Sequence, residues 1–133
     1  MSLKPISLNF CELFDAGNIA GLRELISPAV AASFNGSPTM PRDALLGMVQ
    51  QFQSAFSQSK HTPIRQIAEA DWVVTVFKWT AVHTGEFNGL PATGRPVAID
   101  IVQMDRIVDQ RIVEHHGYAD VAAMMQQLAA PAA

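Results

Sequence analysis

The chain has 133 residues, 49% of them hydrophobic and 16% charged, a balance typical of a soluble globular protein. Its net charge is −3 and it has no basic run, which argues against binding to nucleic acid. Its apolar stretches are too short to cross a bilayer, no export leader is recognisable, and one cysteine cannot form an internal disulfide. We therefore expect a single cytoplasmic domain over residues 1–133, without membrane contact.

The first half of the sequence predicts three helices and one short strand. Residues 5–14 and 19–26 carry apolar side chains at helical spacing, and the second stretch ends before Pro28 because the residue preceding a proline avoids the helical conformation. Residues 29–34 favour a short strand. Residues 41–56 begin with a proline suited to a first helical turn and place their apolar side chains on one face of a third helix.

The second half predicts an antiparallel meander of strands followed by a helix. The apolar pattern changes after residue 60, and we expect strands at 61–70, 72–83, 97–108 and 111–118. Asp109-Gln110 stands where a two-residue hairpin turn would lie, although glutamine tolerates positive φ poorly. Asp120 can cap a last helix that ends at residue 128, and residues 129–133 should form a frayed tail. Helices followed by a meander, with the helices on one face, predict an α+β fold.

Alternation along the strands predicts which side chains face the core. In strand 72–83 the charged Lys78 marks the outer set, so the inner set is Val73, Thr75, Phe77, Trp79, Ala81 and His83. Two charged residues mark the outer set of strand 97–108 in the same way, which places Gln103 and Asp105 inside. The outer face of strand 72–83 is also apolar, and we expect a second copy of the chain to cover it in a homodimer.

Residues 83–95, HTGEFNGLPATGR, end a strand with a histidine and continue into a glycine-rich loop. Together with DQRIVEH at 109–115 and DVAAMMQQL at 120–128, they resemble the SnoaL-like polyketide cyclases, or ester cyclases, of the nuclear-transport-factor-2 and ketosteroid-isomerase-like superfamily. The resemblance covers about residues 8–128. It implies a cone-shaped α+β fold, in which a curved antiparallel or mixed sheet wraps around the N-terminal helices and encloses an apolar cavity.

The resemblance also implies an activity and a class of ligand. In cyclases of this family the cavity holds a polyketide ester, a side chain removes a proton α to a carbonyl, and the enolate closes a ring by intramolecular aldol attack without metal or organic cofactor. We therefore expect a cofactor-independent cyclase or isomerase for a small apolar substrate that carries a carbonyl. A non-catalytic binding module, and a scaffold whose own side chains fill the cavity, are the alternatives on this fold.

His83 is the first candidate for acid–base catalysis, because imidazole titrates close to neutral pH; the alternative is a ring that only pins the loop. Members of the family usually carry G-x-D-I-x-R on the penultimate strand, and this register puts Gln103 at the aspartate position and Asp105 two residues later. An amide can donate a hydrogen bond but cannot take up a proton. The base is therefore Asp105, His83 or His116, or the chain does not run this reaction. The alternative role for Asp105 is structural, as a half-buried carboxylate paired with a cation.

His116 replaces an aromatic residue that is usual in the family, and we expect it to line the cavity and help Gln103 to hold an oxyanion. His115 and Glu114 keep the family pattern. The alternative to a catalytic role is a structural hydrogen bond between histidine and Glu114, together with a pocket histidine whose hydrogen bonds are satisfied within the protein. Because adjacent histidines on a strand diverge, we expect no metal site. Expected substrate contacts are Trp79, Phe77, Asn35, Tyr118 and Phe52, although Asn35 also suits a turn and Tyr118 could pack on the last helix.

Overall fold

The computed structural model describes residues 2–129. Of the tail expected at residues 129–133, Ala129 instead ends the last helix, and residues 130–133 lie outside the described residues. Helices and strands follow one another as α1 (Lys4–Ala16), α2 (Ile19–Leu25), β1 (Ile26–Phe34), α3 (Arg42–Ala55), β2 (Phe56–Glu69), β3 (Trp72–His83), β4 (Pro96–Val108), β5 (Arg111–Ala119) and α4 (Val121–Ala129). This order confirms the predicted α+β class. None of the helices within residues 2–129 is long and apolar enough to cross a membrane.

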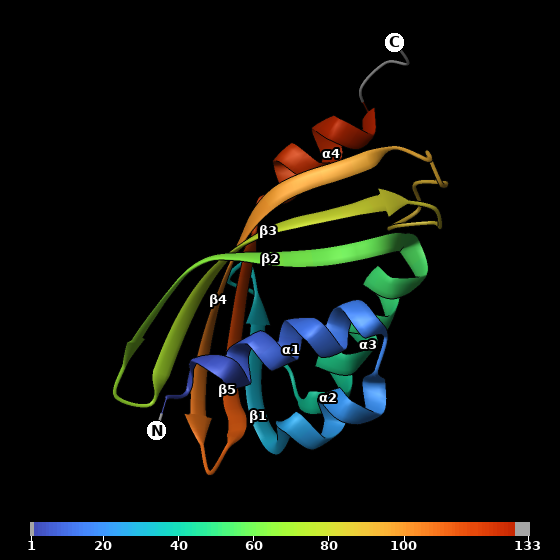
Figure 1. Cartoon of the computed structure of the whole chain (residues 1–133). Helices are drawn as coiled ribbons and strands as arrows, with labels where there is room; N and C mark the ends of the chain where they lie inside the picture. Colours follow the sequence, from blue (N-terminus) through green and yellow to red (C-terminus); the bar gives the residue numbers. More distant parts are fainter. Residues whose placement is uncertain (1, 130–133) are drawn as a thin grey trace.

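The strands form one mixed sheet in the order β1-β5-β4-β3-β2. Strands β2 to β5 pair antiparallel as the predicted meander, whereas β1 pairs parallel with β5 at the edge. Figure 1 shows a strongly bent sheet, with α1, α2 and α3 inside the bend and α4 beside the first half of β4. The bend and the helices together define the hollow in which the candidate site lies.

Two element boundaries differ from the sequence prediction. Helix α3 ends at Ala55, and β2 begins at once with Phe56 rather than at residue 61, because residues 57–60 carry only polar side chains and give no alternation signal. Strand β1 begins at Ile26 and includes Pro28, which its edge position tolerates. The Asp109-Gln110 turn is confirmed, with φ of 51° and 62°, the left-handed values that a two-residue hairpin turn requires.

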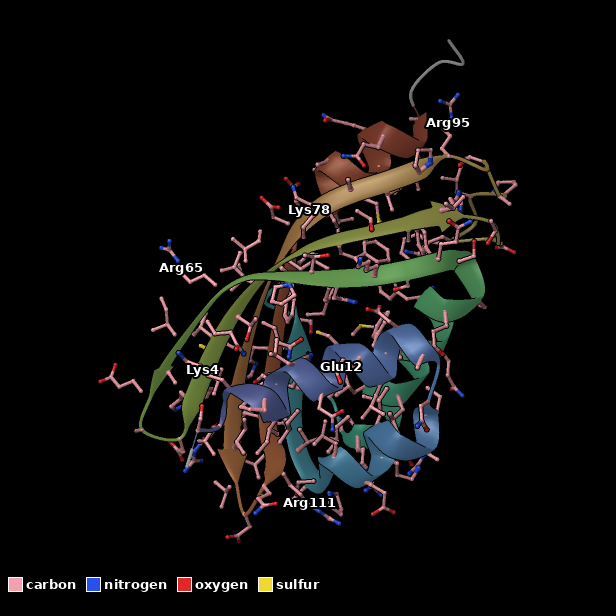
Figure 2. The ribbon with its side chains drawn as sticks, in the orientation of Figure 1. Lys4, Glu12, Arg65, Lys78, Arg95 and Arg111 are labelled. Carbon is pink, nitrogen blue, oxygen red and sulfur yellow. The ribbon has the colours of Figure 1, made fainter. Side chains whose placement is uncertain are left out.

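The predicted alternation of side chains in β3 and β4 is also confirmed. The inner set of β3, from Val73 to His83, is buried, as are Gln103 and Asp105 of β4. On the outer face Lys78 forms an ion pair of 2.8 Å with Asp100 of the neighbouring strand. Figure 2 shows the Lys78 side chain on the side of the sheet that faces away from α1.

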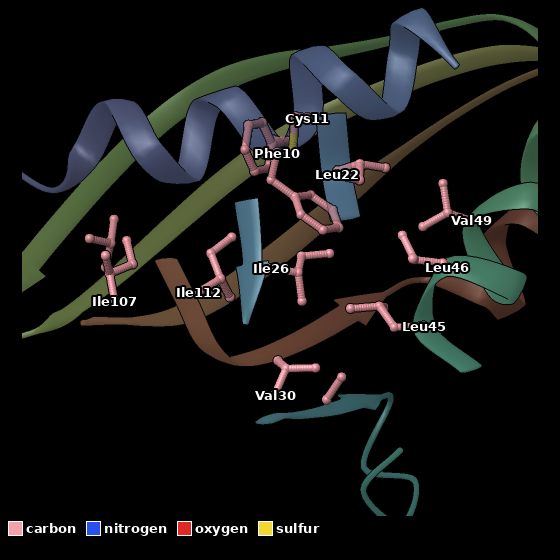
Figure 3. Packing of buried hydrophobic residues seen from close by; sticks show 13 residues of the cluster. Phe10, Cys11, Leu22, Ile26, Val30, Leu45, Leu46, Val49, Ile107 and Ile112 are labelled. Atoms are coloured by element: carbon pink, nitrogen blue, oxygen red, sulfur yellow. The ribbon is translucent and has the colours of Figure 1, made fainter. Parts of the chain in front are cut away.

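Buried apolar side chains gather in two clusters rather than in one continuous core. The first joins α1, α2 and α3 to β1, β3 and β5, and includes Phe10, Leu22, Ile26, Leu45 and Ile112 (Figure 3). The second joins α4 to the last residues of β3 and the first residues of β4, and includes Phe56, Trp79, Phe87, Ile99 and Met124. The space between the two clusters holds a cavity.

Candidate active site

The cavity takes wall residues from both clusters and is mainly apolar. Phe10, Leu45 and Val49 come from the first cluster, and Trp79, Ile99 and Met124 come from the second. Its polar side chains are His61, Gln103 and His115. The volume open to the centres of water molecules is about 70 Å³. A single bound water needs roughly 10–15 Å³ of such volume. The cavity is therefore narrow, but side chains do not fill it.

Asp105 and His115 form a hydrogen-bonded pair at the cavity wall. They lie opposite one another on β4 and β5, and Asp105 Oδ1 is 2.6 Å from His115 Nδ1. Asp105 is fully buried, and its Oδ2 accepts further hydrogen bonds from the Ser7 hydroxyl at 2.8 Å and the Gln103 amide at 2.6 Å. These three donors compensate a buried carboxylate, which in turn fixes the Nδ1–H tautomer of the imidazole.

The His115 ring is held in one orientation with its second nitrogen unpaired. Phe10 of α1 stacks on it, with ring centroids 4.3 Å apart and an angle of 27° between the planes. Within residues 2–129 no hydrogen bond engages His115 Nε2, and the side chain belongs to the cavity wall. An imidazole that donates from Nδ1 to a carboxylate has a free lone pair on Nε2, the arrangement of a general base.

Gln103 and Cys11 support this pair from the side. The Gln103 amide donates to Asp105 and, at 3.4 Å, to the backbone carbonyl of Ser7, while its Oε1 accepts from the Cys11 thiol at 3.4 Å. Burial, reinforced by the negative charge of Asp105, raises the pKa of the Cys11 thiol well above its usual range, so it stays a protonated donor. The Gln103 hydrogens are thus engaged within the protein and orient the carboxylate rather than face a ligand.

The expectation that His116 lines the cavity is wrong, and His115 occupies that place. His116 lies on the opposite face, where Nδ1 is 2.6 Å from Ser33 Oγ and Nε2 is 3.2 Å from Glu114 Oε1. The cause is a bulge in β5: Ile107 and Arg106 are adjacent on β4, but their partners Ile112 and Glu114 are two residues apart. The extra residue shifts the alternation, so Ile112 and His115 both face inward.

His83 is fully buried on the inner face, but it is not part of the cavity wall. Its Nδ1 accepts a hydrogen bond from the Thr93 backbone N–H at 3.2 Å and lies 3.0 Å from the Thr93 hydroxyl, so it ties β3 to the end of the following loop. Its Nε2 is buried without a partner in residues 2–129. These contacts favour the alternative of a loop-pinning ring; the acid–base role of His83 stays a prediction.

The expected substrate contacts divide into two groups. Phe52 and Trp79 line the cavity, whereas Phe77 is buried in the first cluster. Asn35 forms a turn, with φ of 51°, and its side chain accepts a hydrogen bond from the Ala119 backbone, and Tyr118 is 43% exposed. Sequence reasoning missed His115 and His61 as wall residues. No group of three or more metal-binding side chains is found in residues 2–129.

Comparison with known proteins assigns the chain to a family. A family model described as SnoaL-like polyketide cyclase matches residues 6–128. The chain belongs to the SnoaL-like polyketide cyclase family. This membership confirms the resemblance predicted from the loop after β3 and from the two segments that follow it.

Three SnoaL-like relatives illustrate the similarity. Aklanonic acid methyl ester cyclase DnrD of Streptomyces peucetius is 30% identical over 67% of this chain, and the match spans only 62% of DnrD. Nogalonic acid methyl ester cyclase of Streptomyces nogalater is 28% identical over 89% of this chain and 90% of its own length. IdmH of Streptomyces antibioticus, a candidate polyketide cyclase, is 30% identical in sequence to this chain. Its crystal structure superposes on this one with a TM-score of 0.87, over 98% of this chain and 100% of IdmH.

Proposed function

We propose that this SnoaL-like protein closes a ring in a polyketide methyl ester, with His115 as the general base. The relatives named as methyl ester cyclases support the substrate class. The Asp105–His115 pair supports the chemistry, because it presents a free imidazole lone pair to a mainly apolar cavity. The observation that carries the proposal is this single buried pair at the wall.

The reaction would proceed by proton transfer and carbon–carbon bond formation without a cofactor. His115 Nε2 takes the proton α to the ester carbonyl, and the electron pair of the broken C–H bond forms an enolate. The enolate carbon then attacks a ketone carbon of the same molecule, and the alkoxide formed there takes up a proton. Substrate and product are isomers, so no oxidant or reductant is needed. Asp105 would stabilise the imidazolium that forms in the first step.

The polar groups of the wall favour a catalyst over a non-catalytic binding module. A simple binder of apolar molecules would present an evenly apolar surface, whereas here His115 lies in the wall with Asp105 and Gln103 hydrogen-bonded in series behind it. A polar cluster in an apolar interior lowers the stability of the fold wherever one of its polar atoms has no partner. Such clusters are therefore more common at functional sites than elsewhere in a core.

A polycyclic substrate requires the narrow cavity to widen. Phe34, Met48 and Phe52 form part of the wall and belong to the half-buried side chains of β1 and α3. Methionine is unbranched and adaptable, so movement of Met48 would cost little. We infer that the substrate enters between β1 and α3, where these side chains can turn aside.

We also propose that two copies associate through the outer face of the sheet. Half-buried Val74, Val76 and Val82 lie on this face of β3, and Ile67 of β2, which pairs with Val74, is 60% exposed. Apolar side chains gathered on one sheet face are typical of a surface that a partner covers.

Conversion of a defined ester tests the proposed activity. The purified protein is incubated with aklanonic acid methyl ester or nogalonic acid methyl ester, and the products are separated and weighed by mass spectrometry. We expect a product of unchanged mass and new retention time that forms in proportion to enzyme concentration. Recovery of both esters unchanged after long incubation at high enzyme concentration would contradict the proposal.

A further inference from the structure

A second histidine–carboxylate pair, formed by His61 of β2 and Asp15 of α1, reaches the same cavity. His61 of β2 lies opposite Trp79 of β3 and therefore shares its inward face. Its Nδ1 is 2.7 Å from Asp15 Oδ1, and its side chain is 7% exposed and lines the cavity. No hydrogen bond engages His61 Nε2 within residues 2–129.

Asp15 is held by three donors, as Asp105 is. The His61 backbone N–H donates to Asp15 Oδ2 at 2.8 Å, and the Ser59 hydroxyl donates to Oδ1 at 2.7 Å. Ser59 in turn accepts a hydrogen bond from the indole N–H of Trp79 at 2.9 Å. The ring of His61 therefore has a fixed orientation, with Nδ1 directed at the carboxylate, which a histidine that only fills space does not need.

Helix α1 connects the two pairs through one of its faces. Ser7 donates to Asp105 and Phe10 stacks on His115, while Phe14 makes an edge contact with His61, with ring centroids 5.1 Å apart. Positions 10 and 14 are one helical turn apart, or about 6 Å along the axis. Both imidazoles thus line one cavity and contact the same face of α1 at side chains one turn apart, although β3 and β4 lie between their strands in the sheet.

We propose that His61 is a second catalytic residue, the proton donor to the oxygen on which the ring closes. This proposal rests on the proposed function and names the group that protonates the alkoxide in its last step. As the enolate carbon bonds to the ketone carbon, the carbonyl π electrons move to oxygen, and that oxygen takes the proton from His61 Nε2. The reaction leaves His115 protonated and His61 neutral. Exchange with water then returns a proton to His61 and removes one from His115.

The environments of the two pairs support this division of roles. Asp15 is 21% exposed at its side chain, whereas Asp105 is fully buried. A proton donor must be recharged in every turnover, and the partly exposed pair has contact with water for this purpose. Asp15 is then a positioning residue, because it acts through His61.

The variants His61→Gln and Asp15→Asn test the proposal on the ester that the wild-type protein converts. We expect His61→Gln to lower kcat at least about tenfold and to leave KM within about threefold, because a lost proton donor affects the transition state more than binding. Asp15→Asn should lower kcat in the same way, and Asp15→Glu should restore part of it. Asp43→Asn, which removes a carboxylate from an ion pair on the outer side of α3, is the matched control and should match the wild type.

The outcomes separate this inference from the proposed function. If the wild type converts the ester and folded His61→Gln retains its kcat, the inference is wrong and the proposed function stands. If the variants change KM and thermal stability but not kcat, His61 only shapes the wall, and the inference is again wrong. If the wild type converts neither ester, both proposals fall. Should His61→Gln not fold, kcat of Asp15→Asn, which preserves the ring, decides the question.

Discussion

At the scale of single residues, the site depends on how buried polar atoms are paired. Asp105 has no contact with solvent, and its three hydrogen-bond partners come from α1, β4 and β5. Loss of any one partner leaves a buried charge less well compensated, which is far more costly than loss of an exposed contact. The supporting residues Ser7 and Gln103 should therefore matter for stability as well as for activity.

Cys11 should be unreactive in the folded protein. It is buried, and the raised pKa of its thiol leaves little thiolate, the reactive form. We expect a disulfide reagent such as DTNB at pH 8 to label less than about a tenth of the native protein in an hour, and to label it fully in concentrated urea. Rapid stoichiometric labelling without urea would contradict the described packing of α1 on β4.

The residue scale also shows where sequence reasoning succeeds and fails. Gln103 and Asp105 are correctly predicted to face inward, because the alternation of β4 has charged residues as markers of its outer side. His116 is expected at the cavity from the family pattern, but His115 lies there instead. A bulge in β5 puts Ile112 and His115 on the same inward face, and this bulge leaves no mark in the sequence. His61 is missed because β2 is mostly polar around it.

At the scale of elements, the contacts of the loop after β3 account for the residue types in its sequence. Asn88 and Gly89 have φ of 47° and 84° and form a tight turn in which Phe87 and Leu90 exchange two backbone hydrogen bonds. The N–H groups at positions 84 and 85 both donate to the Ala55 carbonyl at the end of α3. With His83 bound to Thr93, the loop is fastened at its two ends, and it folds back onto the second core cluster.

Gly85 is required for this approach. A Cβ atom at this position would lie 2.1 Å from the Ser54 carbonyl oxygen, a backbone atom that cannot move aside easily. We expect Gly85→Ala to lower the free energy of unfolding by about 2 kcal/mol, within the range for overpacked sites, as measured by urea denaturation.

Gly47→Ala is the control for this substitution. Gly47 lies within α3 with open space around its Cα, so alanine should leave stability unchanged or raise it by about 0.5–1 kcal/mol through helix propensity. Equal stability of Gly85→Ala and the wild type would mean that the loop does not lie against α3 as described.

At the scale of the whole molecule, two clusters of apolar side chains lie on the inner side of the bent sheet and leave a cavity between them. The α+β class, the meander and the inner faces of β3 and β4 follow from patterns that act locally, and they are predicted correctly. The parallel pairing of β1 with β5 and the meeting of α1 with both histidine pairs depend on distant contacts. Neither leaves a local pattern, so neither could be derived from alternation or spacing.

The proposed dimer makes a prediction at this scale. Val76 lies near the middle of the outer face of β3, and a charge there would be buried without a partner in a dimer. We expect light scattering after gel filtration to give twice the chain mass for the wild type and about the chain mass for Val76→Glu. Asp43→Asn, outside this face, should remain dimeric. A wild-type protein of single-chain mass at the same concentration would exclude the proposed interface.

The central claim is that His115, oriented by Asp105, is the base of the reaction. Its most direct test is kcat of folded His115→Gln, with His83→Gln alongside, on an ester that the wild type converts. We predict a loss of at least about a hundredfold for His115→Gln and a much smaller loss for His83→Gln, which should mainly loosen the loop. Wild-type turnover in His115→Gln, together with loss of turnover in His83→Gln, would contradict the account.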